Sequence, residues 1–224
     1  LALQDILEGR GLCFIDPHGD AAEDLLNLIP PERAQDVIYW DPSDTERPFG
    51  LNMLEYTDEN NKQFVVEQII GMLYKLYDPN KTGIIGPRLE HAVRNTMLTV
   101  MAYPGGSLIE VVRALQDITF VREILPLVND PLVRRYWTDQ IEKTDDFHKA
   151  ETLDYFVSKF SKFVYNSMLR NIIGQTKTSF NIREIMDNGK IFIVNLSKGR
   201  LGEDNSQFLG LILVPKILAA AMSR

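Results

Sequence analysis

The sequence predicts an α/β fold, with a mostly parallel and incomplete sheet into which a large all-helical subdomain is inserted. Two short apolar runs, Leu12–Ile15 and Val37–Trp40, each end in an acid followed by proline. A third run, Lys190–Leu196, follows a long stretch that carries only helix-like spacing. Continuous apolar runs of this length are typical of parallel strands that are covered on both faces.

The first part of the chain reads as helix, strand, helix, strand. Residues 1–9 have helical spacing that ends at Gly9 and Gly11, since glycine commonly closes helices. A strand is expected over 11–16, and a loop over Pro17–Asp20 leads to a helix over 21–29. The second strand is expected over 36–41. This spacing is typical of a βαβ unit with a right-handed crossover.

The middle of the chain is expected to be helical, because its apolar residues recur at helical spacing between prolines. The expected helices are 64–77, 89–101, 107–115, 119–128, 132–141 and 152–163. The α/β pattern then resumes with a helix over 182–186, a strand over 190–196, a polar loop over 197–200 and a long apolar helix over 204–222. We therefore assign residues 1–56 and 171–224 to the α/β domain and 57–170 to the helical subdomain.

Composition indicates a globular protein: 224 residues, 45% hydrophobic and 25% charged, with a net charge of −7. An acidic total argues against a general nucleic-acid coat, although a local basic face stays possible. The single cysteine, Cys13, lies in an apolar run, so we expect a small buried side chain in a reducing cytoplasm. We find no run near the roughly 20 apolar residues of a membrane span and no signal peptide. The start at Leu1 and the stop after an apolar run suggest that both ends are cut.

Two polar turns follow predicted strands, and ligands of open parallel sheets bind at the carboxyl ends of strands. The first turn, Asp16–Asp20, supplies acids and an imidazole, and the second, Asn195–Arg200, supplies cations. We expect the two turns to lie side by side. Asp16, His18 and Asp20 are the candidate cofactor-binding residues, and Asp16 could hold a metal-bound water. The alternative is that Asp16 and Asp20 cap the next helix while Gly19 makes the turn.

Asp16 and His18 also resemble the first metal ligands of binuclear phosphoesterases. That function needs further histidines, and the two that remain, His91 and His148, fall in the helical region. We therefore predict no metal site formed by the protein. A phosphate-binding Gly-x-x-x-x-Gly-Lys-Ser/Thr sequence is absent, Gly174–Thr178 is interpreted as a turn, and no strand ends in paired acids.

Five segments together resemble one family, the ATPases of type IV secretion and conjugative DNA transfer, which are similar to TraG/TraD coupling proteins and to HerA/FtsK motors. The segments occur in the family's order and are Leu12–Asp20, Pro48–Asn52, Gly86–His91, Leu169–Gln175 and Gly189–Glu203. The resemblance implies a RecA-like sheet whose phosphate loop lies one helix before Asp16 and whose acidic catalytic strand follows the last helix. It also implies that the helical subdomain faces DNA or a partner protein.

The function implied is ATP hydrolysis, with ATP and Mg²⁺ bound by the intact parent, in a homo-oligomeric, hexameric bacterial ring. Implied partners are DNA, single- or double-stranded, and secretion-channel or relaxase-type proteins. The expected location is the cytoplasm, at the inner face of the plasma membrane if segments outside this chain anchor it. In such rings a cation from the neighbouring subunit stabilises the transferred phosphoryl group. Candidates are Arg200 and Lys198, acting with Asp16, and alternatively Arg88 and Arg170; the alternative for Arg88 is an ion pair beside Glu90.

Arg134–Trp137 combines cations and aromatic rings, as surfaces that bind single-stranded nucleic acid do. The alternative is that Tyr136 and Trp137 pack inward while the arginines extend into solvent. Two rival functions also stay open: a helical interaction module on a decayed nucleotide-binding scaffold, and the metallophosphoesterase. A Gly-Lys-Ser/Thr about twenty residues upstream of Asp16 would favour the motor.

Overall fold

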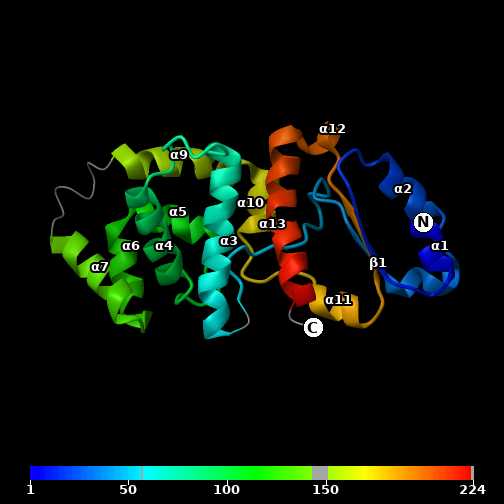
Figure 1. Cartoon of the computed structure of the whole chain (residues 1–224), viewed down its shortest axis with the longest axis horizontal. Helices are drawn as coiled ribbons and strands as arrows, with labels where there is room; N and C mark the ends of the chain where they lie inside the picture. Colours follow the sequence, from blue (N-terminus) through cyan, green and yellow to red (C-terminus); the bar gives the residue numbers. More distant parts are fainter. Residues whose placement is uncertain (57, 143–150, 223–224) are drawn as a thin grey trace. The chain divides into compact units, whose positions relative to one another are not determined.

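A computed structural model describes residues 1–56, 58–142 and 151–222 of the chain. Their contacts form two compact units, which we call unit 1, Leu1–Phe49 with Ser179–Arg224, and unit 2, Gly50–Thr178. Unit 1 contains a parallel sheet with helices, and the described part of unit 2 is helical (Figure 1). The α/β class predicted from the sequence is therefore confirmed.

The sheet of unit 1 has three parallel strands, β1 (Leu12–Asp16), β2 (Val37–Trp40) and β3 (Ile191–Asn195), in the order β1-β3-β2. Every residue of β3 is buried, because β3 has a strand on each side. β1 and β2 are successive in sequence but do not pair with each other. The βαβ segment inferred from the sequence thus crosses over β3, the strand from the far end of the chain.

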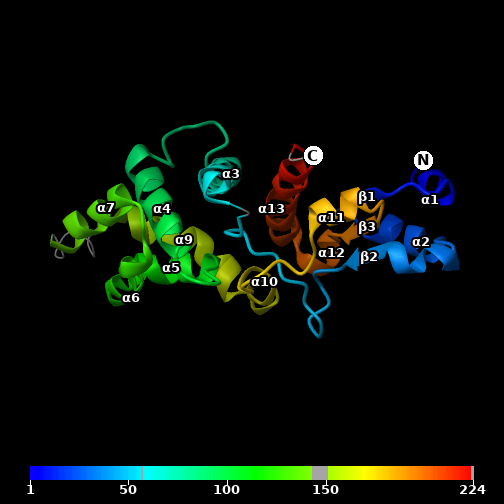
Figure 2. The same cartoon turned by 90° about the horizontal axis from the view of Figure 1, so that it is seen from below.

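Helices cover both faces of this sheet (Figure 2). On one face α1 (Ala2–Leu7) and α2 (Asp20–Asn27) pack Ile6, Ala22 and Leu25 against Ile191 and Ile193. On the other face lie Phe180, whose ring centroid is 4.9 Å from that of Phe192, and the helices α11 (Ile182–Asp187) and α13 (Glu203–Met222). Two short helices that the sequence did not predict complete the unit: η1 (Pro31–Asp36) and α12 (Lys198–Leu201).

Cys13 is exposed, so the prediction of a buried side chain was wrong. The apolar run around Cys13 forms β1, an edge strand of the sheet. Desolvation by the surrounding atoms still raises the pKa of the Cys13 thiol to about 11. The thiol is therefore protonated at neutral pH and a poor nucleophile, because the thiolate is the reactive form.

α13 corrects the expectation that no run of the sequence approaches the length of a membrane span. Among the described residues it is the one helix long and apolar enough, by length and composition, to cross a membrane, with a mean hydropathy of 1.4. Core helices of soluble proteins satisfy the same criterion, and α13 packs Phe208, Leu209 and Leu213 into the protein. Val214 and Leu218 on the same helix are exposed.

Unit 2 is built around α4 (Pro87–Val100), which packs against α3 (Glu59–Tyr77), α5 (Leu108–Gln116), α7 (Pro131–Glu142) and α9 (Glu151–Tyr165). The remaining helices are α6 (Ile118–Ile124), η2 (Leu125–Leu127) and α10 (Ser167–Ile173). Leu89, Val93, Met97 and Val100 of α4 are buried, in agreement with the helical spacing of the sequence. α10 was not among the helices that we predicted.

Unit 2 extends at both ends beyond the helical subdomain that we drew at 57–170. Residues 50–56 and 171–178 belong to unit 2 because they bond to each other and to its helices. Leu51 N–H donates to Ile172 O at 3.0 Å, and the buried Asn52 Nδ2 donates to Gly106 O and Thr176 O, each at 3.0 Å. We placed the boundaries by hydrophobic periodicity, and hydrogen bonds of polar side chains do not affect that periodicity.

Candidate functional site

The candidate site is the carboxyl edge of the unit 1 sheet, where all three strands end. Asp16 is in register with Asn195, and Trp40 is in register with Val194. Leu196 N–H donates to Asp16 O at 2.8 Å, and Lys198 N–H donates to Pro17 O at 3.0 Å. The two polar turns therefore lie side by side, and that prediction from the sequence is confirmed.

Gly19 makes this close approach possible. Its φ is +98°, a conformation that residues with a Cβ seldom adopt. A Cβ at this position would lie 2.8 Å from Asn195 Oδ1 and 2.9 Å from Ser197 Cβ. Glycine is thus required both by the backbone and by contact with the second turn.

The carboxylate of Asp16 caps α2. Asp16 is 4% exposed, its Oδ1 accepts from His18 N–H at 2.8 Å, and its Oδ2 accepts from Ala22 N–H at 3.0 Å. Burial raises the pKa of Asp16, but hydrogen bonds from the amides of His18, Ala22, Gly19 and Ala21 outweigh it, so the pKa is lowered. The capping role, which the sequence left as one of two alternatives, is the one that the geometry shows for Asp16.

Asn195, the last residue of the central strand β3, bonds to Tyr39 of the outer strand β2 and to the second turn. It is fully buried, its Nδ2 donates to Tyr39 Oη at 2.9 Å, and its Oδ1 accepts from Ser197 N–H at 3.1 Å. Burial is the main reason that the pKa of Tyr39 is raised, which keeps its hydroxyl protonated. We had not selected Asn195 or Tyr39 as site residues. The signal for Asn195 was available: it is a polar residue that ends an otherwise apolar strand.

The two predicted cations are exposed on α12, and both form ion pairs within unit 1. Arg200 Nη2 is 2.5 Å from Glu23 Oε1, and Arg200 Nη1 is 3.2 Å from Asp41 Oδ2. The hydrogen bond that Arg200 donates to Glu23 is the main cause of the raised pKa of Arg200. Lys198 Nζ is 3.0 Å from Glu203 Oε1. We had not selected Glu23 or Asp41, because no sequence feature near either residue indicates a partner on α12.

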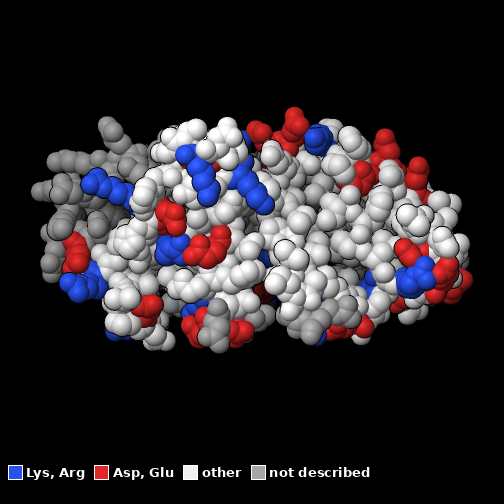
Figure 3. Space-filling model, in the orientation of Figure 1, with Lys and Arg blue, Asp and Glu red and all other residues white. Residues whose placement is uncertain are grey.

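The other candidates of the first turn are solvent-accessible. His18 and Asp20 are both exposed, Asp20 as the first residue of α2. In the right-hand part of Figure 3, which shows unit 1, acidic side chains outnumber basic ones. An acidic surrounding explains why the nearby cations are found in ion pairs.

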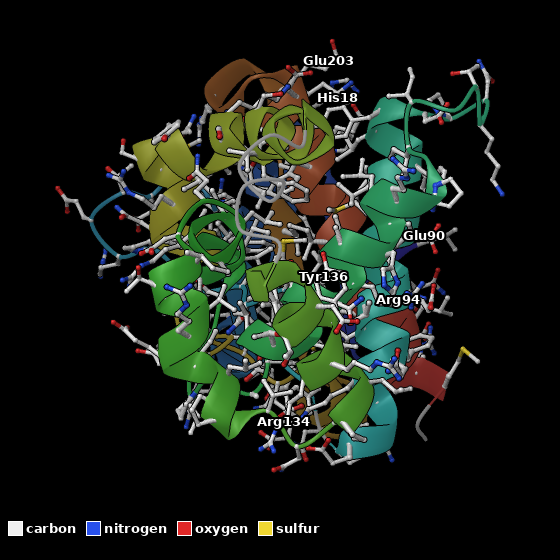
Figure 4. The ribbon with its side chains drawn as sticks, turned by 90° about the vertical axis from the view of Figure 1, so that its left-hand side faces the viewer. His18, Glu90, Arg94, Arg134, Tyr136 and Glu203 are labelled. Carbon is white, nitrogen blue, oxygen red and sulfur yellow. The ribbon has the colours of Figure 1, made fainter. Side chains whose placement is uncertain are left out.

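The alternative arginine-finger candidates, Arg88 and Arg170, belong to unit 2. Arg88 is exposed in the first turn of α4, and Arg170 is exposed in α10. Glu90, which we had considered as a partner of Arg88, pairs with Arg94 at 3.0 Å and accepts from Tyr74 Oη at 3.2 Å. Figure 4 shows Glu90 and Arg94 together on α4.

In the segment Arg134–Trp137 the aromatic side chains pack toward the protein, as in the second of the two alternatives drawn from the sequence, and they do not form an open surface with the arginines. Trp137 is fully buried and donates from Nε1 to Thr99 Oγ1 at 2.7 Å. Tyr136 lies half-buried against His91, and burial raises its pKa to about 12. Arg134 donates to the carbonyls of Val128 and Pro126, and Arg135 lies 3.8 Å from Asp139. DNA contact at this segment stays a prediction.

Metal binding gains no support from the described residues, which contain no group of three or more His, Cys, Asp or Glu placed to hold an ion. His91 lies on α4 of unit 2, and His148 falls outside the described residues. The metallophosphoesterase alternative stays a prediction for which the described residues offer no ligand set.

No family model, no curated protein and no solved structure matches this chain. The carboxyl edge must accordingly be judged by its own chemistry. It offers two exposed cations that are held in ion pairs, an exposed imidazole, and the buried Asn195 bonded to the half-buried Tyr39. An anion such as phosphate would bind the two cations by displacing their carboxylate partners.

Proposed function

We propose that this chain is part of an ATP-hydrolysing motor that moves DNA in conjugation or type IV secretion, with unit 1 as part of a RecA-like domain. The observation that carries the proposal is the direct contact between the turns after β1 and β3 at one edge of a parallel sheet. Both turns belong to segments that resemble the transfer ATPases. Phosphate sites of open parallel sheets occur at this edge.

Phosphate is the ligand that the side chains of this edge fit. Lys198 and Arg200 are exposed; Lys198 is paired with one exposed carboxylate, Glu203, and Arg200 with two, Glu23 and Asp41. Ion pairs at the surface are weak, so a phosphate can compete with these partners. A phosphoryl group carries more charge than a carboxylate and accepts bidentate bonds from arginine. Arg200 would stabilise the charge that develops on the transferred group, in its own or a neighbouring subunit of a ring.

Asp16 is not placed primarily as a magnesium ligand. Both of its carboxylate oxygens accept amide hydrogen bonds, with which a metal would compete. In the proposal the triphosphate and its metal are held mainly by a phosphate loop and an acidic strand of the longer protein, as the resemblance implies. Asp16 then positions the first turn rather than the metal.

The proposal is tested by DNA-stimulated ATP hydrolysis of the full-length protein. We expect Arg200→Ala to lower kcat by about a hundredfold or more, because an arginine at the transferred phosphoryl group contributes on the order of a thousandfold. Arg183→Ala is the matched control: Arg183 is a surface arginine of unit 1 paired with Asp187, and its replacement should change kcat less than twofold.

Two outcomes would reject the motor. One is a parent gene without a Gly-Lys-Ser/Thr upstream of Asp16, and the other is a full-length protein that neither binds nor hydrolyses ATP. Either result favours the helical interaction module. If the protein hydrolyses ATP and Arg200→Ala is as active as the wild type, the motor survives and the role of Arg200 is lost.

A further inference from the structure

The turn between α11 and β3 contains the one Asn-Gly pair of the sequence, Asn188–Gly189. Asparagine followed by glycine is prone to deamidation, because glycine places no side chain beside the main-chain nitrogen that attacks the amide carbon. Asn188 is exposed, and its side-chain amide makes no hydrogen bond to the residues that the structure describes. Water therefore reaches this amide, and the side chain is free to turn.

The reaction consumes only water. The nitrogen of Gly189 attacks Asn188 Cγ, a C–N bond forms, and the side-chain nitrogen leaves as ammonia with the proton of the Gly189 N–H. The product is a five-membered succinimide, which water then opens. Cleavage at Cγ gives aspartate on the original main chain. Cleavage at the carbonyl carbon of position 188 gives isoaspartate, whose main chain runs through Cβ and Cγ and is longer by one methylene group.

The main chain at Asn188 is one rotation away from this reaction. Ring closure requires Cβ of Asn188 and the nitrogen of Gly189 to lie on the same side of the Cα–C bond. The ψ of Asn188 is 7°, so the nitrogen of Asn188 occupies that side, and Cβ is turned away from it. A flip of the peptide between the two residues brings Cβ into place. The flip turns ψ of Asn188 and φ of Gly189 in opposite directions, so the flanking residues need not move.

The flip breaks one long hydrogen bond. Gly189 N–H donates to Met186 O at 3.4 Å, which exceeds the usual range of roughly 2.7–3.2 Å. Gly189 has a φ of +59° and, without a Cβ, also accepts the extended φ that the flip produces. The bond from Arg33 to Gly189 O at 3.2 Å stays in place. The bond from Lys190 N–H to Ile185 O at 3.0 Å stays in place as well.

We propose that Asn188 deamidates in the folded protein through this flip, and that the isoaspartate product weakens the amino edge of the unit 1 sheet, where the strands begin. The turn fits that edge closely. A Cβ on Gly11 would lie 2.4 Å from the carbonyl carbon of Gly189, and β3 begins two residues later at Ile191. An added methylene group displaces Gly189 from Gly11 and from Arg33. The reaction requires neither ATP nor the carboxyl edge, so it stands apart from the proposed function.

The test is incubation of the folded chain at pH 8, followed by trypsin digestion and mass spectrometry. The peptide Glu184–Lys190 should show, with time, an acid in place of one amide. Isoaspartyl methyltransferase, which methylates isoaspartate but not ordinary L-aspartate, should label it. Asn205 is the internal control, because it precedes a serine within α13 and its Nδ2 donates to Leu201 O at 2.7 Å. The peptide that contains Asn205 should stay unmodified over the same period.

Gly189→Ala should slow the deamidation at least several-fold, because a methyl group hinders both the attack and the flip. A Cβ at Gly189 would lie 3.9 Å from Gly11 N, which is an ordinary contact, so the variant has the space to fold. A cooperative unfolding transition in circular dichroism would establish that it does.

The effect on stability is measured by urea denaturation of the isoaspartyl chain after separation by ion exchange. Asn188→Asp is the matched control, because it carries the added charge on a main chain of ordinary length. The isoaspartyl chain should unfold at a lower urea concentration than Asn188→Asp, which should unfold close to the wild type.

The proposal is overturned if Asn188 keeps its amide in the folded chain over a period in which the urea-unfolded chain loses it. It is equally overturned if folded Gly189→Ala deamidates as fast as the wild type, or if the isoaspartyl chain unfolds together with Asn188→Asp.

Discussion

Asp16 is a buried carboxylate whose two oxygens accept hydrogen bonds from the amides that begin α2. We expect Asp16→Asn to lower the free energy of unfolding by about 1–2 kcal/mol at pH 7, because the amide group of asparagine cannot accept at both positions. The pKa of Asp16 is lowered, so its contribution is present above the ordinary value of 3.8 and is lost as pH falls through the lowered pKa.

Urea denaturation of wild type and Asp16→Asn at pH 7 and at pH 2 measures this contribution, and the difference between the proteins should shrink at the lower pH. Asp20→Asn is the matched control, because Asp20 is exposed at the first residue of the same helix. Equal unfolding midpoints for Asp16→Asn and the wild type at pH 7 would contradict the capping role.

Residues of the candidate site differ in how far the sequence revealed them. Gly19 and Asp16 could be assigned to a turn and a cap, since both roles depend on neighbours within a few positions. The partners of Arg200 could not. Glu23 lies 177 positions away in sequence and Asp41 lies 159 positions away, and only the pairing of β1, β2 and β3 brings them together.

At the scale of elements, Arg33 of η1 joins the segments at the amino edge of the sheet. Its guanidinium donates to Ile6 O at 2.9 Å and to Gly189 O at 3.2 Å, and its Nε is 2.8 Å from Asp36 Oδ2. Its side chain is 14% exposed. Arg33 thus connects η1, the end of α1 and the turn before β3.

We expect Arg33→Ala to lower the free energy of unfolding by about 2–3 kcal/mol, because three carbonyls, those of Ile6, Arg10 and Gly189, and one carboxylate lose a charged donor at a largely buried position. Arg33→Lys should recover less than half of the loss, since a single ammonium cannot span these acceptors. Chemical denaturation provides the measurement. Arg10→Ala, at an exposed arginine paired with Asp5 and Glu8, should leave the unfolding midpoint close to that of the wild type. A loss for Arg33→Ala no larger than for Arg10→Ala would refute this role.

Two glycines at the same edge explain why the turns before β1 and β3 approach so closely. A Cβ on Gly11 would lie 2.4 Å from the carbonyl carbon of Gly189. Gly189 itself has a φ of +59°. The sequence indicated turns at both positions, but it could not indicate that the two turns touch.

At the scale of the whole molecule, the chain enters and leaves unit 2 through segments that Asn52 joins. Asn52 is 2% exposed, donates to the carbonyls of Gly106 and Thr176, and accepts from Leu54 N–H at 2.9 Å. Gly50 is required beside it, because a Cβ there would lie 2.5 Å from Lys177 O. Closure of unit 2 therefore depends on a few polar contacts near its two ends.

Asn52→Ala should lower the free energy of unfolding of unit 2 by about 2 kcal/mol, because buried acceptors and the amide of Leu54 lose their partner. Hydrogen exchange followed by mass spectrometry should show faster exchange in peptides from 50–56 and 171–178, with unit 1 unchanged. Asn80→Ala, in an exposed loop of unit 2, should leave both unchanged. Acceleration confined to unit 1 would contradict this account.

The sequence by itself determined the α/β class, the three strands, most of the helices and the contact between the two polar turns. These follow from hydrophobic periodicity and turn residues, which act over a few positions, and from the rule that parallel strands end at a common edge. The tertiary structure alone decided the order β1-β3-β2, the exposure of Cys13 and the partners of Arg200. Each of these depends on which strand lies beside which, and that is set by packing between segments far apart in the chain.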